Sequence, residues 1–169
     1  GTSTGRYAFA RAVGNNTDAY DGGMAYDGSR NLTFHTNANS ERMRIDGSGN
    51  LLVGTTDVDL GYTDGDSGVA LKPDGPIQAA RDSAYSILYL NKLNNNGPLI
   101  DFHKDGVIVG SIGVIHNNNL FIGAPSHSGL QFGTSVVYPT GGSTGDANDA
   151  TVDIGASGQR FKDLYLSGK

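Results

Sequence analysis

The chain of 169 residues contains no cysteine and no tryptophan. The absence of cysteine excludes a disulfide framework and a thiolate metal site. It does not identify the compartment, because a protein made in a reducing cytosol and later exposed outside a cell can do without disulfides. The absence of tryptophan removes the strongest aromatic platform on which a sugar ring stacks.

Positive charge is also scarce. Lysine and arginine number 12 against 17 aspartates and glutamates, which gives a net charge of -5 and a pI near 5.1. Proteins that bind nucleic acid carry basic patches, so no nucleic-acid partner is expected. No run of like charge forms a basic membrane patch, and no apolar stretch approaches the roughly 20 residues that span a bilayer, so no membrane insertion is expected.

Apolar mass is the third shortage. Apolar residues make up 37% of the chain, below the ~45 to 50% of ordinary domains. Glycine takes 26 positions, about twice its usual share of ~7%. Glycine adds no side chain to a core and raises the entropy lost on folding. We therefore expect an obligate homo-oligomer whose copies share apolar area.

The apolar residues that are present recur at every second position in short runs, which is the pattern of β-strands. The runs are Leu32–Phe34, Met43–Ile45, Leu51–Val53, Val69–Leu71, Ile100–Phe102, Val107–Val109, Leu120–Ile122, Leu130–Phe132 and Val152–Ile154. Pairs that favour hairpin turns stand between them: Asp27-Gly28, Asp46-Gly47, Gly49-Asn50, Asp74-Gly75, Asn96-Gly97 and Asp105-Gly106. The sequence therefore predicts an all-β fold of short antiparallel strands and hairpins, with the alternating apolar residues as its core.

Two local expectations complete this picture. One short helical turn is expected near residues 159–164, where Phe161 and Leu164 lie three positions apart. Tyr85 and Tyr89 fall in strand phase, which assigns them to packing rather than to binding.

A weak internal repeat indicates two related β units. The runs at 31–36 and 43–46 resemble those at 119–124 and 130–133. We expect one unit at 1–60 and a second at 76–138, joined by a linker at 57–75 that is rich in aspartate and glycine. Residues 139–169 are expected to form a loop followed by a closing C-terminal strand and turn.

Three stretches resemble a known family: Glu41–Thr56 (ERMRIDGSGNLLVGTT), Leu99–Gly113 (LIDFHKDGVIVGSIG) and Thr151–Gly168 (TVDIGASGQRFKDLYLSG). All three are similar to the distal, receptor-binding segments of bacteriophage tail fibres and tailspikes. The resemblance implies a homotrimer, intertwined or side by side, carried on the virion and made in the host cytoplasm. It also places the chain before a C-terminal intramolecular chaperone domain, with Lys169 either at a processing point or at an arbitrary boundary.

Tailspikes of this kind often hydrolyse polysaccharide, which requires two carboxyl groups about 5 to 9.5 Å apart, one of them protonated. The only glutamate, Glu41, lies near Arg42 and Arg44 and is expected to form a cross-strand ion pair. Most aspartates stand beside Gly, Asn or Ser, where they cap turns. No enzymatic activity is therefore expected from the chain itself.

Metal binding is weakly supported, and no cofactor is expected. Ca²⁺ ligands could gather near Asp57, Asp59, Asp64 and Asp66, but the segment lacks the closing bidentate acid of a calcium loop. A solvated linker is the simpler interpretation of these aspartates. On a three-fold axis His127 would be triplicated into a metal triad, which stays an alternative to an ordinary loop histidine.

Sugar binding has lower requirements, because aromatic faces stack on sugar rings while polar side chains satisfy hydroxyl groups. Such groups belong on loops of a rigid scaffold. The candidates, in or beside turns rich in Gly and Asp, are Tyr20, Tyr26, Tyr62, Asp64, Asp66 and Tyr138. The expected function is attachment to a bacterial surface polysaccharide without cleavage. The alternatives are a structural shaft or trimerisation segment and, more remotely, a capsule depolymerase with an intersubunit active site.

Overall fold

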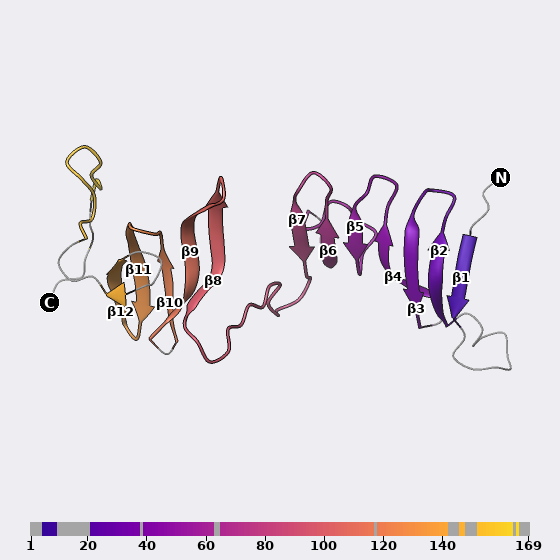
Figure 1. The fold of residues 1–169 in the computed structure, drawn as a ribbon, viewed down its shortest axis with the longest axis horizontal. Helices are drawn as coiled ribbons and strands as arrows, with labels where there is room; N and C mark the ends of the chain where they lie inside the picture. The colour runs from indigo at the N-terminus through magenta and orange to yellow at the C-terminus, as the bar shows by residue number, and fades with distance from the viewer. Residues whose placement is uncertain are drawn as a thin grey trace. The chain divides into compact units, whose positions relative to one another are not determined.

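The computed structural model describes residues 5–9, 21–37, 39–62, 65–116, 118–141, 146–147, 152–163 and 165. These residues form two antiparallel sheets and no helix, which confirms the predicted all-β class (Figure 1). Within this described part, no helix is available that could cross a membrane. The chain divides into two compact units, Gly1–Tyr89 and Leu90–Lys169.

The first unit holds a sheet in which each strand pairs with its neighbours in sequence. Its seven described strands are β1 (Gly5–Phe9), β2 (Gly22–Tyr26), β3 (Leu32–Thr36), β4 (Ser40–Ile45), β5 (Leu51–Val53), β6 (Gly68–Leu71) and β7 (Ile77–Ala80).

The second unit holds a sheet of six described strands, again paired in sequence order. They are β8 (Gly97–Lys104), β9 (Val107–Ile115), β10 (Asn119–Gly123), β11 (Ser128–Gly133), β12 (Val136–Gly141) and the two-residue β13 (Asp146–Ala147).

The division into units falls within the segment 81–96, which contains no strand and whose residues are all exposed. The segment 57–75, which the sequence suggested as the linker, lies inside the first unit and contains β6. Its described residues form the loop before β6, the strand itself, which pairs with β5 and β7, and the turn that follows it.

Asp27 and Asp46 close the β2–β3 and β4–β5 hairpins with the same hydrogen bonds. In each loop one carboxylate oxygen accepts the backbone N–H groups two and four residues further on, all at 2.9 Å. The other oxygen accepts the side-chain amide of Asn31 or Asn50. The fourth loop residue, Arg30 or Gly49, has a positive φ. The shared pattern Asp-Gly-Ser-x-Asn thus encodes one loop used twice.

One face of the first sheet is covered by the chain itself. Leu52 of β5 and Ala70 of β6 are fully buried beneath Leu60, and Val58 and Ala80 pack against this cluster. Leu60 belongs to the loop between β5 and β6, so this loop folds back over the sheet. Apart from Leu52, the residues toward this face are mostly small or polar, for example Thr33.

The opposite face of the first sheet, here called the open face, carries the larger apolar residues, and the structure buries none of them fully. Its members alternate along each strand with the residues of the other face. They are Tyr7, Met24, Tyr26, Leu32, Phe34, Met43, Ile45, Leu51, Val53, Val69, Leu71, Ile77 and Ala79. Within the single chain these alternating apolar residues are not the buried core, because its own loop covers the other face at β5 and β6. Their place in the core of an oligomer stays a prediction.

The second sheet repeats this asymmetry. Phe121 and Gln131, which pair across β10 and β11, are buried on one face. The apolar residues on either side of them, among them Ile122, Leu130 and Phe132, point to the other face and are exposed.

Three expectations of local structure fail. Residues 152–154 form no strand. No helical turn forms in the described residues 159–163, because Gln159 instead exchanges two backbone hydrogen bonds with Ala156. Tyr85 and Tyr89 lie in the exposed segment 81–96 and do not pack on a strand. Alternation is a local pattern. Residues 152–154, Tyr85 and Tyr89 carry it, but they pair with no neighbouring strand in the described structure.

Candidate functional site

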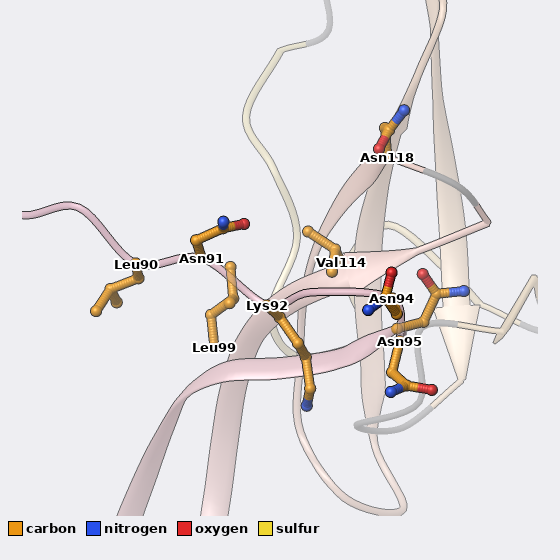
Figure 2. Close-up of a pocket in the computed structure, with 9 residues that line it drawn as sticks. Leu90, Asn91, Lys92, Asn94, Asn95, Leu99, Val114 and Asn118 are labelled. Atoms are coloured by element: carbon orange, nitrogen blue, oxygen red, sulfur yellow. The ribbon is translucent and has the colours of Figure 1, made fainter.

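The candidate site is a hollow of about 470 Å³ at the start of the second unit. It lies where the segment 90–96 approaches the strands β8 and β9, and Figure 2 shows the side chains around it. The lining consists of Leu90, Asn91, Lys92, Asn94, Asn95, Asn96, Leu99, Val114 and Asn118.

Backbone geometry and one lysine hold the wall of this hollow in place. Asn94 and Gly97 have positive φ angles of 64° and 130°, which asparagine and glycine adopt most readily. Gly97 then pairs with Val114 at the start of β8. The Lys92 ammonium donates a hydrogen bond to the Pro98 carbonyl oxygen at 3.2 Å, which ties the segment to the strand that follows it.

The fifth asparagine of the lining arrives from elsewhere in the chain. Asn118 belongs to the turn between β9 and β10, has a φ of 137° and donates its N–H to the Ile115 carbonyl oxygen at 3.3 Å. It stands 22 positions or more after the other asparagines of the lining. The antiparallel pairing of β8 with β9 is what brings this turn near the segment 90–96.

The five asparagine side chains of the lining are exposed, and within the described residues no hydrogen bond is recorded for their amide groups. Each amide offers two N–H donors and a carbonyl acceptor. Leu90, Leu99 and Val114 add apolar surface beside them. The nine lining residues include no carboxylate and no imidazole, so the arrangement offers recognition of a polar ligand and no side chain suited to proton transfer near neutral pH.

Of the residues predicted to bind sugar, Tyr62 and Asp66 lie together in the structure. The Asp66 carboxylate accepts the backbone N–H groups of Gly61 and Tyr62 at 2.9 and 3.1 Å, while the Tyr62 side chain is 80% exposed. Asp66 also lines a shallow hollow of about 280 Å³ with Arg81.

The other predicted sugar-binding residues that the structure describes, Tyr26 and Tyr138, lie on strands. Tyr26 lies on the open face, between Gly5 and Leu32 in the strand register. Tyr138 is on β12 of the second unit, where its ring lies over Gly133. Tyr20 and Asp64 lie outside the described residues.

Two of the aspartates proposed as calcium ligands, Asp57 and Asp59, are engaged in other contacts. Asp57 accepts the backbone N–H of Asp59 at 2.9 Å, and Asp59 pairs with the Lys72 ammonium at 2.8 Å. This hydrogen bond is the main reason why the pKa of Lys72 is raised. In the part of the chain that the structure describes, no three metal-ligating side chains gather.

Glu41 and His127 differ in how they meet the expectations from the sequence. Glu41 forms its ion pair with Arg44 of the same strand, with one contact at 2.7 Å, and not across strands. A bulge in the β3–β4 register beside His35 accompanies this arrangement. His127 lies in the turn between β10 and β11, where its N–H donates to the Ala124 carbonyl oxygen at 3.1 Å.

The asparagine hollow was missed by reasoning from the sequence. The run Asn94–Asn96 is visible as a polar turn, but nothing local connects it with Asn118. Tyr85 and Tyr89 were also misplaced. Both rings are exposed, and the Arg81 guanidinium lies 4.8 Å from the centre of the Tyr85 ring.

Comparisons of the chain with protein-family models, with curated proteins and with solved structures find no match.

Proposed function

We propose that this chain is a homotrimeric segment of a phage tail fibre or tailspike, which attaches the virion to a bacterial surface by binding polysaccharide without cleaving it. The observation that supports binding is the group of five asparagine amides without hydrogen-bond partners in the described residues around the 470 Å³ hollow. The family resemblance of the sequence motifs supplies the virion context.

The chemistry of the hollow suits a chain of sugars. Hydroxyl groups are donors and acceptors at once, and amides match both roles. Leu90, Leu99 and Val114 offer apolar contact to the C–H faces of a sugar ring. The lining contains no aromatic ring, so a single site is expected to be weak. Three copies on one fibre would raise the effective concentration by orders of magnitude.

A structural shaft is the second candidate, and the open face favours it. A sheet that exposes Val53, Val69 and Leu71 on one side is suited to association along a fibre, because apolar surface is stabilised when it leaves water. A shaft would need this surface and would not need the asparagine hollow.

A screen of bacterial polysaccharides on a glycan array tests the proposal. The variant Asn91→Ala/Asn95→Ala removes two amides at positions without a positive φ, so it changes the lining and not the backbone. Tyr62→Ala, in the first unit, is the matched control. We expect selective binding that the double asparagine variant loses and the control keeps.

Two other results of the glycan screen would change the proposal. Binding that Tyr62→Ala loses and the asparagine variant keeps would move the site to the loop of Tyr62 and Asp66. No binding by the intact oligomer to any polysaccharide would overturn attachment in favour of the shaft.

A further inference from the structure

The open face of the first sheet is continuous across seven strands. Residues that pair directly across neighbouring strands share one face of a sheet. One such row runs Tyr26, Leu32, Ile45, Leu51, Leu71 and Ile77, and a second runs Tyr7, Met24, Phe34, Met43, Val53, Val69 and Ala79. The two rows lie two residues apart on each of the strands β2 to β7, so they form a single apolar strip across the sheet.

The strip contains no charged side chain, and Ile45, Val53 and Val69 are exposed within it. Val53 is 43% exposed, whereas its neighbour Leu52 is 0% exposed on the covered face. A contiguous apolar patch of this kind on a soluble protein marks an interaction surface. A partner that binds through charged side chains would meet no opposite charge in the two rows.

The size of the surface fits association of whole chains. The two rows supply thirteen residues. About 20 to 30 residues per partner form a stable interface of standard size, and the thirteen residues of the first sheet alone supply roughly half of that number.

We propose that the open face of the first sheet packs against the open face of other copies of the same chain. A two-row strip with regular spacing matches itself, since side chains of facing sheets interdigitate about 10 Å apart. The small apolar share of the composition fits the same arrangement, because the copies supply one another's missing core. The inference rests on the proposed fibre only for the number of copies and is independent of sugar binding.

The loop between β5 and β6 fixes which side faces inward. Leu60 covers Leu52 and Ala70, so the covered face cannot serve as a second apolar interface. In the assembly the covered face therefore points outward, with the loop that carries Tyr62 and Asp66.

Light scattering on the full chain and on a charged variant tests the interface. Ile45→Glu/Val69→Glu places one charge in each row, on strands that are not neighbours. Leu88→Glu/Leu93→Glu makes the same change at exposed residues outside both sheets. We expect a mass that is a multiple of 17.6 kDa for the wild type and for the control, and the mass of one chain for the interface variant. A wild-type mass of one chain at micromolar concentration would overturn the proposal, as would an interface variant that stays oligomeric.

Cross-linking gives a result even if the charged variant fails to fold. The chain has no cysteine, so in Val53→Cys a short bis-maleimide can join only different copies. We expect rapid linkage of Val53→Cys and little linkage of Leu88→Cys. Equal linkage of the two would contradict a face-to-face contact. Neither light scattering nor cross-linking involves a sugar. Their results therefore test the interface even if the glycan screen finds no binding.

Discussion

At the scale of single residues, the two carboxylates Asp27 and Asp46 connect loop shape with charge. The pKa of Asp27 is lowered chiefly by the backbone and side-chain hydrogen bonds from Asn31. For Asp46 burial acts to raise the pKa, but the hydrogen bonds from Asn50 and its neighbours outweigh burial and leave the pKa lowered. Both loops therefore bind the ionised form of the acid more strongly than the neutral form.

We expect the protein to lose stability in acid because of these two groups. A lowered folded-state pKa stabilises the fold fully above the unfolded value of 3.8, and this contribution is lost as the pH falls through the folded values. Thermal melting followed by circular dichroism should show a midpoint that falls as the pH drops below about 4.

The variant Asp27→Asn/Asp46→Asn is the control for the acid effect. The single amide oxygen at each position can still accept the two backbone N–H groups of its loop and does not titrate, while the hydrogen bond from the Asn31 or Asn50 side-chain amide is lost. The fall in melting midpoint below pH 4 should become smaller in this variant. An identical fall in both proteins would show that other groups cause the acid sensitivity.

At the scale of elements, the packing of β9 against its neighbours depends on the absence of a side chain at Gly113. A Cβ built there would lie 2.7 Å from the Phe121 ring and 2.7 Å from Pro98 Cα, on the two adjacent strands. Gly110, on the same strand, would meet its nearest neighbour at an ordinary 3.5 Å.

We expect Gly113→Ala to lower the free energy of unfolding by about 1 to 3 kcal/mol, the usual cost of overpacking. Gly110→Ala should leave it unchanged or raise it by about 0.4 to 1 kcal/mol, because alanine restricts the unfolded chain. Urea unfolding of the two variants, at equal protein concentration, provides the comparison. Equal effects of the two substitutions would refute the close packing at Gly113.

Most strands could be predicted because their signals are local. Runs such as Leu51–Val53 alternate with period two and stand between hairpin pairs such as Asp46-Gly47. The strand β7 was missed, since its sequence Ile-Gln-Ala-Ala carries little alternation and becomes a strand only by pairing with β6. The strand β12 was missed for a similar reason, because it contains Pro139 and ends at Gly141.

The faces of the sheet and the candidate site depend on contacts between distant residues. Alternation shows that Leu51 and Val53 share a face, but the position of Leu60 decides which face is covered. Leu60 lies in a loop without periodic pattern, so its role has no signal in the sequence. In the same way the hollow needs Asn118 beside Asn94–Asn96, and only the β8–β9 pairing supplies this proximity.

At the scale of the whole molecule, the segment 81–96 separates two units that each have their own sheet. All of its residues are exposed and none belongs to a strand. Backbone of this kind enters a protease cleft more readily than backbone held in a sheet.

We expect trypsin to make its first cut between the two sheets after Arg81 or Lys92, as early as any cut at Arg160 and Lys162, which are also exposed and outside the strands. Arg44 lies within β4 and pairs with a strand on both sides. Arg42, at the bulge of the same strand, still accepts the Gly54 N–H with its carbonyl oxygen at 2.9 Å, and both arginines should be cut much later. Mass spectrometry of a time course identifies the order of cleavage. The variant Arg81→Gln/Lys92→Gln should resist this first cut, and early cleavage at Arg42 or Arg44 would contradict the assignment of the units.

Both described sheets pair every strand with its neighbours in sequence, and this has a consequence for how such a chain can change in length. A meander has no crossover, so each added hairpin joins only the strand before it. A gene duplication covering β3 and β4 would therefore widen the first sheet by two strands and leave every other pairing intact. Because contacts are local, the enlarged sheet would still assemble in order as the chain is synthesised. The architecture can thus grow by whole hairpins without a new fold.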